Sequence, residues 1–552
     1  MNRLKLIFSF FLLILFVIII RLFYLQILSP DFYTADYTKT KKIEPKRGRI
    51  FDRNNLPLAV NQTKYLLFAQ PKTISNKEYV VNSIDEVLKI GEATISSRLN
   101  MEKDWVAIKS GISEELKRQI EALQIPSLGF DEKQYRFYPE ASLAAHLVGF
   151  LGKNDVGDSI GYFGIEGFYN KDLAGLPGIV KSERDLMGRP ILVGTQEHLG
   201  AEDGRDFKLT IDKSIQLIVK EKLVGAVSRL KAEAGCVIAV QPNTMAILAL
   251  SCVPDFDPES YFTFPPEYYS NWLISSSYEP GSTFKPLVLA AAIEDKVIKA
   301  DDPYNEAGPI KIGDYIVSNW NDKYDGEITY GRVIEKSSNV GMVDIGQKLG
   351  KEKLSQYIND RYQFGNLTGV DLQGEVRGTV KTLDKWYAID AATVTFGQGI
   401  SVTGMQLISA FSSLINGGYL MQPYIVDEVI DSKGSKKREP RVLGRTISKE
   451  TSEIMKKVLK STVENAEAKW KIPEGFSFGG KTGTAQIAVS GKYDATKTIA
   501  SFIGFAPADN PEFLMLVVIR QPEVSSWGSE TAAPLFFDIS RDILLYLNIS
   551  PE

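Results

Sequence analysis

The sequence predicts a multidomain chain of the mixed α+β and α/β class. It has three expected parts: an N-terminal transmembrane helix, an elongated domain of mixed helices and strands, and a C-terminal domain whose antiparallel sheet is sandwiched by helices. Three observations carry this prediction. An apolar segment opens the chain, Gly and Pro punctuate short strands in the next region, and helical and strand periodicities alternate after residue 206. The 552 residues suffice for two or more domains with separate cores.

The N-terminal apolar segment is long enough to cross a membrane. Leu6–Ile20 carries no charge, and apolar residues resume over Leu22–Ile27 after Arg21. A helix over these 22 residues spans about 33 Å, enough for the hydrocarbon core of a bilayer. No small-x-small cleavage site follows, so an uncleaved anchor is favoured over a signal peptide or a buried helix. Basic residues flank the segment on both sides, so charge leaves its orientation open.

Changes in composition and periodicity divide the chain. The predicted boundaries are residues 1–27 for the anchor, 28–46 for a polar and basic connector, 47–205 for the elongated domain and 206–552 for the C-terminal domain. Helical periodicity in the elongated domain falls near 79–100 and 112–123. The C-terminal domain is expected to contain a helix over Ile215–Val227, strands over Cys236–Val240, Ala246–Ser251, Ile425–Ile430, Gly479–Val489, Thr498–Phe505 and Phe513–Ile519, and a last helix from Ala533 to about Leu547. Strands from both ends of this domain predict one sheet.

Composition excludes several classes of function. The net charge of -4, without basic-aromatic or zinc-finger patterns, gives no indication of a nucleic-acid partner. With two His and two Cys, a His- or Cys-ligated metal is not expected, and no cofactor is predicted. A Ser-His-Asp triad would require His146 or His198, so serine chemistry is expected to use another base.

Both cysteines, Cys236 and Cys252, fall on neighbouring predicted strands. We interpret them as small, buried apolar side chains. A disulfide outside the cell is the alternative, and the spacing of the two residues leaves it open.

The main chemical motif is the Ser-x-x-Lys pair within the run YEPGSTFKP. Pro280 and Gly281 end the preceding segment, and apolar residues then recur at helical spacing. Ser282 is therefore expected at a helix N-terminus, where its N–H lacks an intrahelical partner and can bind an oxyanion. Lys285 lies one turn later on the same face. Its amine can accept the Ser282 proton if burial or nearby cations keep it neutral.

Two observations bear on how specific this motif is. A second Ser-x-x-Lys pair, Ser228 with Lys231, lies near the end of a predicted amphipathic helix, and we interpret it as solvated surface. By contrast, the Ser282 pair is followed by Ser337-Ser338-Asn339. There a second hydroxyl and a carboxamide can relay a proton and hold an amide substrate. Taken alone, that stretch could equally be an ordinary helix cap.

The third motif, GGKTGT, opens a predicted apolar strand. In a strand, Lys481 and Gly483 share one face while Thr482 and Thr484 share the other. An ammonium and hydroxyls beside glycines suit an extended peptide laid along the strand edge with its carboxylate bound. A plain hairpin glycine is the alternative for this stretch alone. Three motifs in this order, each in its expected local context, favour a common site.

Together the three motifs resemble those of the penicillin-binding proteins and serine β-lactamases. Segments outside them resemble class B, the monofunctional transpeptidases: Arg47–Arg53, Arg136–Pro139, Ala145–Gly149, Gly164–Glu166, Glu183–Asp185 with Gly188-Arg189, Gly397–Gly399 and Ala533-Pro534. By this resemblance, residues 47–205 form a pedestal domain of the dimerisation type and residues 206–552 form a transpeptidase domain. No segment resembles a glycosyltransferase domain. Asn55 and Met245 stand where that family usually has Gly.

The resemblance implies acyl transfer on D-Ala-D-Ala stem peptides. Ser282 would attack the peptide carbonyl, with Lys285 as the base. Ser337 would pass a proton to the leaving D-Ala, and Asn339 would bind the substrate amide. An amine from a neighbouring stem would then resolve the acyl-enzyme, and β-lactams would acylate the same serine.

The same resemblance assigns the third motif to substrate binding. Lys481, Thr482 and Thr484, beside Gly483, would hold the terminal carboxylate of the stem peptide. The N–H groups of Ser282 and Thr484 would form the oxyanion hole.

The resemblance also implies a location and partners. The chain would be a single-pass protein of the bacterial plasma (inner) membrane, with a short cytoplasmic N-terminus and its catalytic domain outside the cytoplasm. Expected partners are stem peptides, β-lactams, a SEDS-family glycan polymerase that contacts the anchor and Arg47–Arg53, and other division or elongation proteins. Ser338 with Val340-Gly341 resembles the septal enzymes more than the elongation enzymes.

The sequence leaves two rival functions open. A β-lactamase or D,D-carboxypeptidase has the same motifs but hydrolyses the acyl-enzyme with water, and the expected pedestal and anchor count against that function. A penicillin sensor or division scaffold without catalysis is the rival from another class. The complete set of motifs counts against that reading.

Overall fold

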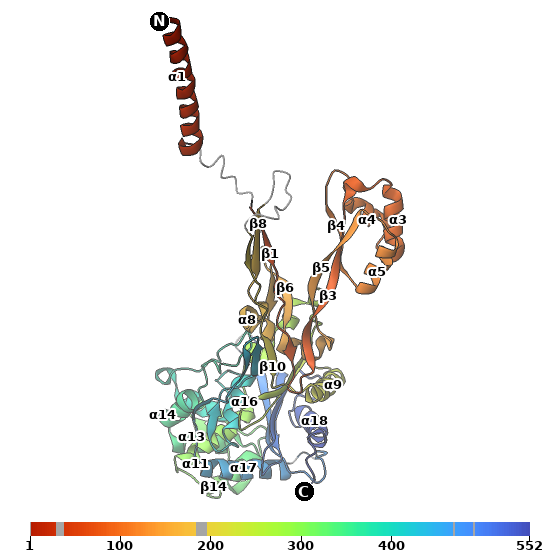
Figure 1. Cartoon of the computed structure of the whole chain (residues 1–552). Coiled ribbons are helices and arrows are strands. Elements are labelled where there is room, and N and C mark those ends of the chain that lie inside the picture. Colours follow the sequence, from red (N-terminus) through yellow and green to blue (C-terminus); the bar gives the residue numbers. More distant parts are fainter. Residues whose placement is uncertain are drawn as a thin grey trace. The chain divides into compact units, whose positions relative to one another are not determined.

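The computed structural model describes residues 2–28, 38–183, 196–466, 468, 470–489 and 492–551 (Figure 1). The chain separates into two compact units. One consists of Met1–Arg47 with Ala174–Gly204, and the other consists of Gly48–Leu173 with Arg205–Glu552.

The smaller unit begins with the apolar helix. Helix α1 covers Asn2–Phe23, and a π-helical turn continues it over Tyr24–Leu28. Within the span Arg3–Ile27, the most apolar stretch of 18 residues has a mean hydropathy of 3.0 and none of it is buried inside the protein, so the span is long and apolar enough to cross a membrane. A small antiparallel sheet follows, with β1 (Thr38–Ile43), β8 (Gly178–Glu183) and β9 (Gln196–Leu199). A strand in the predicted connector was not expected, because the partner of β1 lies far away in the sequence.

The larger unit contains an α/β lobe built on the long strand β3 (Pro57–Ala69). Within this lobe, β3 pairs antiparallel with β4 (Val106–Ile112) and with β5 (Leu128–Phe137). The helix expected over 79–100 is two helices, α3 (Lys77–Leu88) and α4 (Glu92–Arg98). Lys89 and Gly91, with φ of +48° and +89°, break it.

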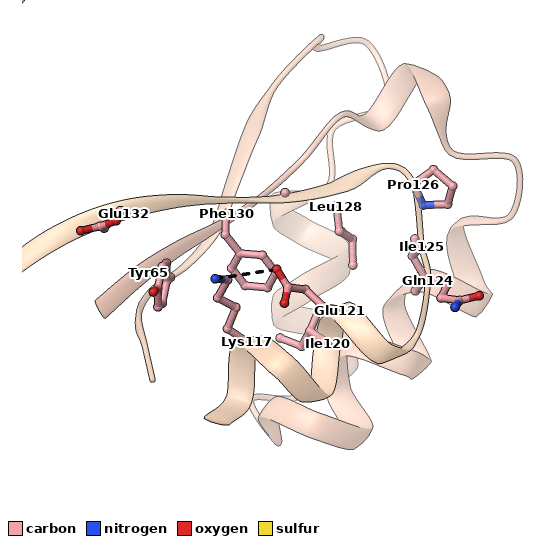
Figure 2. Close-up of a pocket in the computed structure, with 11 residues that line it drawn as sticks. Tyr65, Lys117, Ile120, Glu121, Gln124, Ile125, Pro126, Leu128, Phe130 and Glu132 are labelled. Carbon is pink, nitrogen blue, oxygen red and sulfur yellow. Dashed lines mark ion pairs between the residues drawn. The ribbon is translucent and has the colours of Figure 1, made fainter. Parts of the chain in front are cut away.

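A third helix of this lobe, α5 (Glu114–Ala122), agrees with the expected 112–123 and is capped by Ser113, whose side chain accepts the Leu116 N–H. A cavity of about 620 Å³ opens beside α5 (Figure 2). Lys117 and Glu121 face each other at its wall, with their charged atoms 3.8 Å apart. No residue of the three sequence motifs lines this cavity.

A mixed sheet joins the lobe to the rest of this unit. Its further strands are β2 (Ile50–Phe51), β10 (Asp206–Leu209), β20 (Val426–Asp431) and β21 (Gly434–Lys437), in the order β21-β20-β10-β2-β3-β4. The strand expected over Ile425–Ile430 therefore exists, but it pairs with β10 and not with the C-terminal sheet as predicted. Its periodicity identified a strand, while its partner depends on long-range packing that a local pattern does not encode.

Asn55 and Met245 stand where the family usually has glycine. Their φ angles of +64° and +59° lie in the left-handed region that glycine adopts easily.

The predicted C-terminal sheet is present with five antiparallel strands in the order β12-β11-β25-β24-β23. Their bounds are β11 Ala234–Val240, β12 Ile247–Val253, β23 Gly479–Val489, β24 Lys492–Ala506 and β25 Phe513–Arg520. Two long helices pack on one face, α9 (Lys213–Leu230) and α18 (Ala532–Tyr546), and Figure 1 shows them side by side.

The other face of the sheet shares a hydrophobic core with four helices: α11 (Lys285–Glu294), α13 (Asn339–Leu349), α16 (Gly404–Ser412) and α17 (Lys449–Glu464). Along β11, Val237 and Ala239 belong to the core with α9 and α18, whereas Cys236 and Ile238 belong to the core with α11. This alternation buries both faces of the sheet, and it confirms the predicted helix–sheet–helix sandwich.

The two cysteines are bonded, and the interpretation of two separate buried thiols was wrong. Cys236 and Cys252 are directly opposite each other on β11 and β12, with their Cα atoms 4.1 Å apart and a disulfide between them. The register of the hairpin decides this pairing, and sequence spacing alone does not give that register.

Candidate active site

Ser282 lies at the start of the helix that carries it. A single 3-10 turn, Gly281–Phe284, runs directly into α11, and Pro286 occupies the first turn of that helix, where its missing N–H breaks no hydrogen bond. Gly281 has φ of +57°, and its N–H donates to the Gly397 carbonyl at 3.1 Å. The Ser282 N–H is therefore among the first amides of the helix, which have no carbonyl partner within it.

The Ser-x-x-Lys pair meets Ser337 and Asn339 at one place. The Lys285 Nζ donates to the Ser337 carbonyl at 2.6 Å, to the Ser337 Oγ at 3.2 Å and to the Asn339 Oδ1 at 2.8 Å. The Ser337 hydroxyl in turn donates to the Ser282 Oγ at 3.0 Å. Ser337 therefore connects the hydroxyl of Ser282 with the amine of Lys285.

The amine of Lys285 is set up to lose its proton. Its side chain is fully buried, and burial is the main cause that holds its pKa well below the usual lysine value. The Lys481 ammonium lowers the pKa further, while the Glu306 carboxylate opposes both effects. The amine is thus available in its neutral form at a lower pH than that of an ordinary lysine.

Ser337 is held in a strained conformation. Its φ is +55°, in the left-handed region that side chains with a Cβ rarely adopt. The next residue, Ser338, caps α13 by accepting the Gly341 N–H at 2.8 Å. The helix cap weighed as the alternative for this motif is thus real, and it belongs to Ser338. It leaves the Ser337 and Asn339 side chains directed at Lys285.

The third motif lies on β23, which forms one edge of the five-stranded sheet. Lys481 is 2% exposed, and its Nζ donates to the Thr482 carbonyl at 3.1 Å and to the Thr482 Oγ1 at 3.2 Å. Burial lowers the pKa of Lys481 to about 7. A carboxylate that binds beside it would restore its charge, because an anion favours the ammonium form.

Gly483 and Thr484 bring β23 against the turn that carries Ser282. A Cβ at Gly483 would lie 2.8 Å from the Thr283 Cγ2, so glycine permits this close approach. The Thr484 Oγ1 accepts the Gly528 N–H at 3.0 Å, which fixes that side chain from the segment after β25.

The second Ser-x-x-Lys pair lies elsewhere. Ser228 is in the last turn of α9, and Lys231 ends that helix with φ of +48°. Both residues are exposed, as the prediction of a solvated surface requires.

His146 is buried with its ring Nε2 2.8 Å from the Tyr268 carbonyl, and burial lowers its pKa to about 4.

Comparison with known proteins places this geometry in a family. The family model described as penicillin binding protein transpeptidase domain matches residues 235–541, and the model described as penicillin-binding protein dimerisation domain matches residues 42–209. This chain belongs to the penicillin-binding proteins.

Similar proteins make it a class B penicillin-binding protein. The stage V sporulation protein D of Bacillus subtilis (strain 168) is 35% identical over 564 residues, which cover 100% of this chain and 86% of that protein. The peptidoglycan D,D-transpeptidase FtsI of Escherichia coli (strain K12) is 28% identical over 548 residues, 96% of this chain and 90% of FtsI. The crystal structure of penicillin-binding protein 2X from Streptococcus thermophilus aligns with a TM-score of 0.79 at 25% identity, covering 93% of this chain and 80% of that one.

Several residues of this penicillin-binding protein contribute to the site without a signal in the sequence analysis. Glu306 and Asn319 hydrogen-bond the Ser337–Asn339 segment, and Gly528 bonds Thr484. Gly397, by contrast, belongs to a segment that resembles class B enzymes, and a Cβ there would lie 2.2 Å from the Gly281 carbonyl oxygen. The sequence around Glu306 and around Asn319 does not indicate a role in the site, because these residues come into contact with the motif only when the chain folds.

The pedestal segments of the resemblance have a structural role where the structure describes them. The Arg136 Nε donates to the Glu166 carboxylate at 2.6 Å, and the Arg136 Nη1 donates to the Gly48 carbonyl at 2.8 Å. The side chains of Arg136 and Glu166 are both buried. These contacts join three of the segments that resemble class B enzymes. Residues 184–189, which carry another of them, lie outside the described residues.

Proposed function

We propose that this chain is a serine-type peptidoglycan D,D-transpeptidase that cross-links stem peptides through an acyl-enzyme on Ser282 and is inhibited by β-lactams. The hydrogen-bonded connection from Ser282 through Ser337 to the buried Lys285 amine is the observation that carries the assignment of roles. The matches to the transpeptidase family over residues 235–541 support the reaction class.

In the first step, the Ser282 Oγ attacks the carbonyl between the two D-Ala residues. With Lys285 neutral, both hydrogen bonds reverse, so that the Ser282 hydroxyl donates to the Ser337 Oγ and the Ser337 hydroxyl donates to the lone pair of the Lys285 amine. The Ser282 proton passes along this path to Lys285. The new C–O bond forms, the tetrahedral intermediate breaks its C–N bond, and the proton returns through Ser337 to the leaving D-Ala amine. The acceptor amine of a neighbouring stem then attacks the ester carbonyl and forms the new C–N bond, passing its proton to the Lys285 amine through Ser337. The ester C–O bond breaks, and the proton returns through Ser337 to the Ser282 Oγ.

Substrate binding is assigned to the other motif residues. The ammonium of Lys481 and the hydroxyls of Thr482 and Thr484, beside Gly483, hold the terminal carboxylate. Asn339 binds the substrate amide, and the N–H groups of Ser282 and Thr484 receive the oxyanion.

A donor–acceptor assay tests this function. The full-length protein is incubated with a D-Ala-D-Ala stem peptide and an amine-bearing acceptor stem, and cross-linked product and released D-Ala are measured by mass spectrometry. Cross-linked product above hydrolysed product supports the transpeptidase. Hydrolysed peptide alone would make the protein a D,D-carboxypeptidase, rapid release of hydrolysed penicillin would make it a β-lactamase, and a stable penicillin adduct without turnover of stems would favour a sensor or division scaffold.

The domain arrangement is part of this proposal. Residues 1–27 anchor the protein in the bacterial plasma membrane, 28–46 connect, 47–205 form the pedestal and 206–552 form the catalytic domain. Because stem peptides are in the wall, the short N-terminus is cytoplasmic and the catalytic domain lies outside. The apolar helix α1 supports the anchor. Protease protection of an N-terminal tag in intact cells tests this orientation, and digestion of the tag from outside would contradict it.

A membrane polymerase is the proposed partner, because the acyl-transfer site joins stem peptides and does not make glycan, and nascent strands must be delivered to it at high local concentration. We assign a SEDS-family glycan polymerase to the anchor and to Arg47–Arg53. Replacing residues 1–27 with an unrelated anchor should preserve penicillin acylation but reduce co-purification with the polymerase. Normal co-purification and normal growth would show that the anchor only tethers the protein to the membrane. Substitutions at Arg47–Arg53 that leave co-purification unchanged would contradict a contact at that surface.

A further inference from the structure

Glu306 is a buried carboxylate beside the Ser337–Asn339 segment. It is the last residue of β14 (Pro303–Glu306) and is 1% exposed. Its Oε1 accepts the Asn319 Nδ2 at 3.0 Å and the Ser338 hydroxyl, and its Oε2 accepts the Asp325 N–H at 2.9 Å. Within the described part of the chain, no salt bridge reaches this carboxylate. A buried charge held only by neutral donors is costly for folding, so its presence calls for a specific role.

Glu306 determines which way the Asn319 amide points. The carboxylate and the Lys323 carbonyl accept from the Asn319 Nδ2, at 3.0 and 2.9 Å. The Asn319 Oδ1 is then turned toward the start of α13, where it accepts the Asn339 N–H at 2.8 Å and the Val340 N–H at 3.3 Å. A carboxylate only accepts and these backbone amides only donate, so a flipped Asn319 would lose bonds on both sides.

Glu306 also holds the residue between the two site side chains. Ser338 is 1% exposed and bonds Glu306, while its neighbours Ser337 and Asn339 hold the Lys285 amine. Ser338 and Asn319 therefore fix the backbone that follows the strained Ser337. Moving either would change the distances from Ser337 to Ser282 and to Lys285.

We propose that Glu306 is a positioning residue for acylation, whose carboxylate locks Asn319 and Ser338 so that Ser337 and Asn339 stay within hydrogen-bonding distance of Lys285. The proposal rests on the acyl-transfer function assigned to Ser282. The charge of Glu306 has a second effect, because it favours the ammonium form of Lys285.

The sign of this electrostatic effect follows from the groups around the amine. Burial and the Lys481 ammonium lower the pKa of Lys285, and Glu306 raises it. The titratable groups near Glu306 include the Asp325 carboxylate, which pairs with the Lys336 ammonium at 3.7 Å, and the Tyr304 hydroxyl, whose pKa is raised by burial, Asp344 and Glu306. Removing the Glu306 charge lowers the pKa of Lys285 further. The amine then becomes neutral at a lower pH, and the acid limb of the acylation rate moves down in pH.

The test compares Glu306→Gln with Glu306→Asp in the full-length protein. The second-order rate constant for penicillin acylation is measured against pH, and the melting temperature is measured in parallel. In Glu306→Gln, the side-chain NH2 would face the Asp325 N–H, so acylation should fall on the order of 10-fold to 100-fold and its acid limb should move to lower pH. Glu306→Asp keeps the charge with a shorter reach, so its rate should fall while its acid limb stays in place.

Glu294→Gln is the matched control. Glu294 ends α11 and accepts the Ser448 N–H at 2.8 Å and the Ser448 hydroxyl at 2.7 Å, so it bonds in the same manner at the far end of the helix that carries Lys285. The acid limb of the acylation rate in Glu294→Gln should match that of the parent protein. Parent-like rates at every pH in Glu306→Gln would overturn the proposal, as would a rate loss without a shift of its acid limb.

If Glu306→Gln does not fold, Glu306→Asp decides, and acylation at the parent rate would refute the positioning role. Failure of the underlying function is distinguishable, because the parent protein would then form no adduct on Ser282.

Discussion

The Ser337 Oγ lies 3.0 Å from the Ser282 Oγ and is the polar group that joins it to the Lys285 amine. Ser337 takes up this position with a φ of +55°, which is unfavourable for serine. Ser337 therefore combines an unfavourable backbone conformation with a position on the proposed path of proton transfer.

Replacing Ser337 should separate these two properties. Ser337→Ala and Ser337→Gly both remove the hydroxyl, so penicillin acylation should slow by roughly 10²-fold to 10⁴-fold in each. Glycine tolerates a positive φ, so Ser337→Gly should be more stable than Ser337→Ala by about 1 kcal/mol. Acylation rates and urea unfolding of both variants check this. Rapid acylation by either variant would show that the proton bypasses Ser337.

Replacing Lys285 and Lys481 by alanine should slow penicillin acylation in different ways. Lys285→Ala removes the proton acceptor, so it should slow acylation by a penicillin and by its methyl ester to a similar degree. Lys481→Ala removes a ligand of the carboxylate, so it should slow the reaction with the free acid more than that with the ester. The ratio of the two rate constants in each variant is the measurement. Equal losses in Lys481→Ala would contradict its assignment to carboxylate binding.

Burial of Lys481 should make stability depend on pH. Its pKa of about 7 lies below the ordinary 10.5, so between these values the unfolded chain binds more protons at this group than the folded chain does. The resulting contribution to stability rises with pH across that window, and the penalty is fully present below it. Lys481→Met lacks this group, so its melting temperature relative to the parent should be highest near neutral pH and decline toward alkaline pH. A difference that grows with pH would contradict the buried amine.

The Cys236–Cys252 disulfide should stabilise the catalytic domain. It closes a loop with a sequence separation of 16 residues, which corresponds to about 3 kcal/mol in the chain-entropy description. Reductant should lower the urea midpoint of the parent protein by a corresponding amount and leave the Cys236→Ala/Cys252→Ala double variant unchanged. Alkylation of both cysteines in unreduced, denatured protein would show that the bond is absent.

Local patterns predicted much of this site. The break before Ser282 and the helical repeat after it identified a helix start, and the alternation in GGKTGT placed Lys481 and Gly483 on one face of a strand, which the structure shows to be the buried one. Contacts set by long-range packing were not predictable. Glu306 is an ordinary residue at a strand end until the fold brings Asn319 and Ser338 to it, and the partner of β20 and the bond between the cysteines depend on strand register.

Mapping the penicillin adduct tests the central assignment most directly. The full-length protein is treated with benzylpenicillin, digested and analysed by mass spectrometry, with Ser282→Ala and Ser228→Ala treated in the same way. Melting temperatures verify that each variant is folded. The account predicts one adduct on the peptide that contains Ser282 in the parent protein and in Ser228→Ala, and none in Ser282→Ala. A full adduct on folded Ser282→Ala would contradict the assignment of Ser282 as the nucleophile.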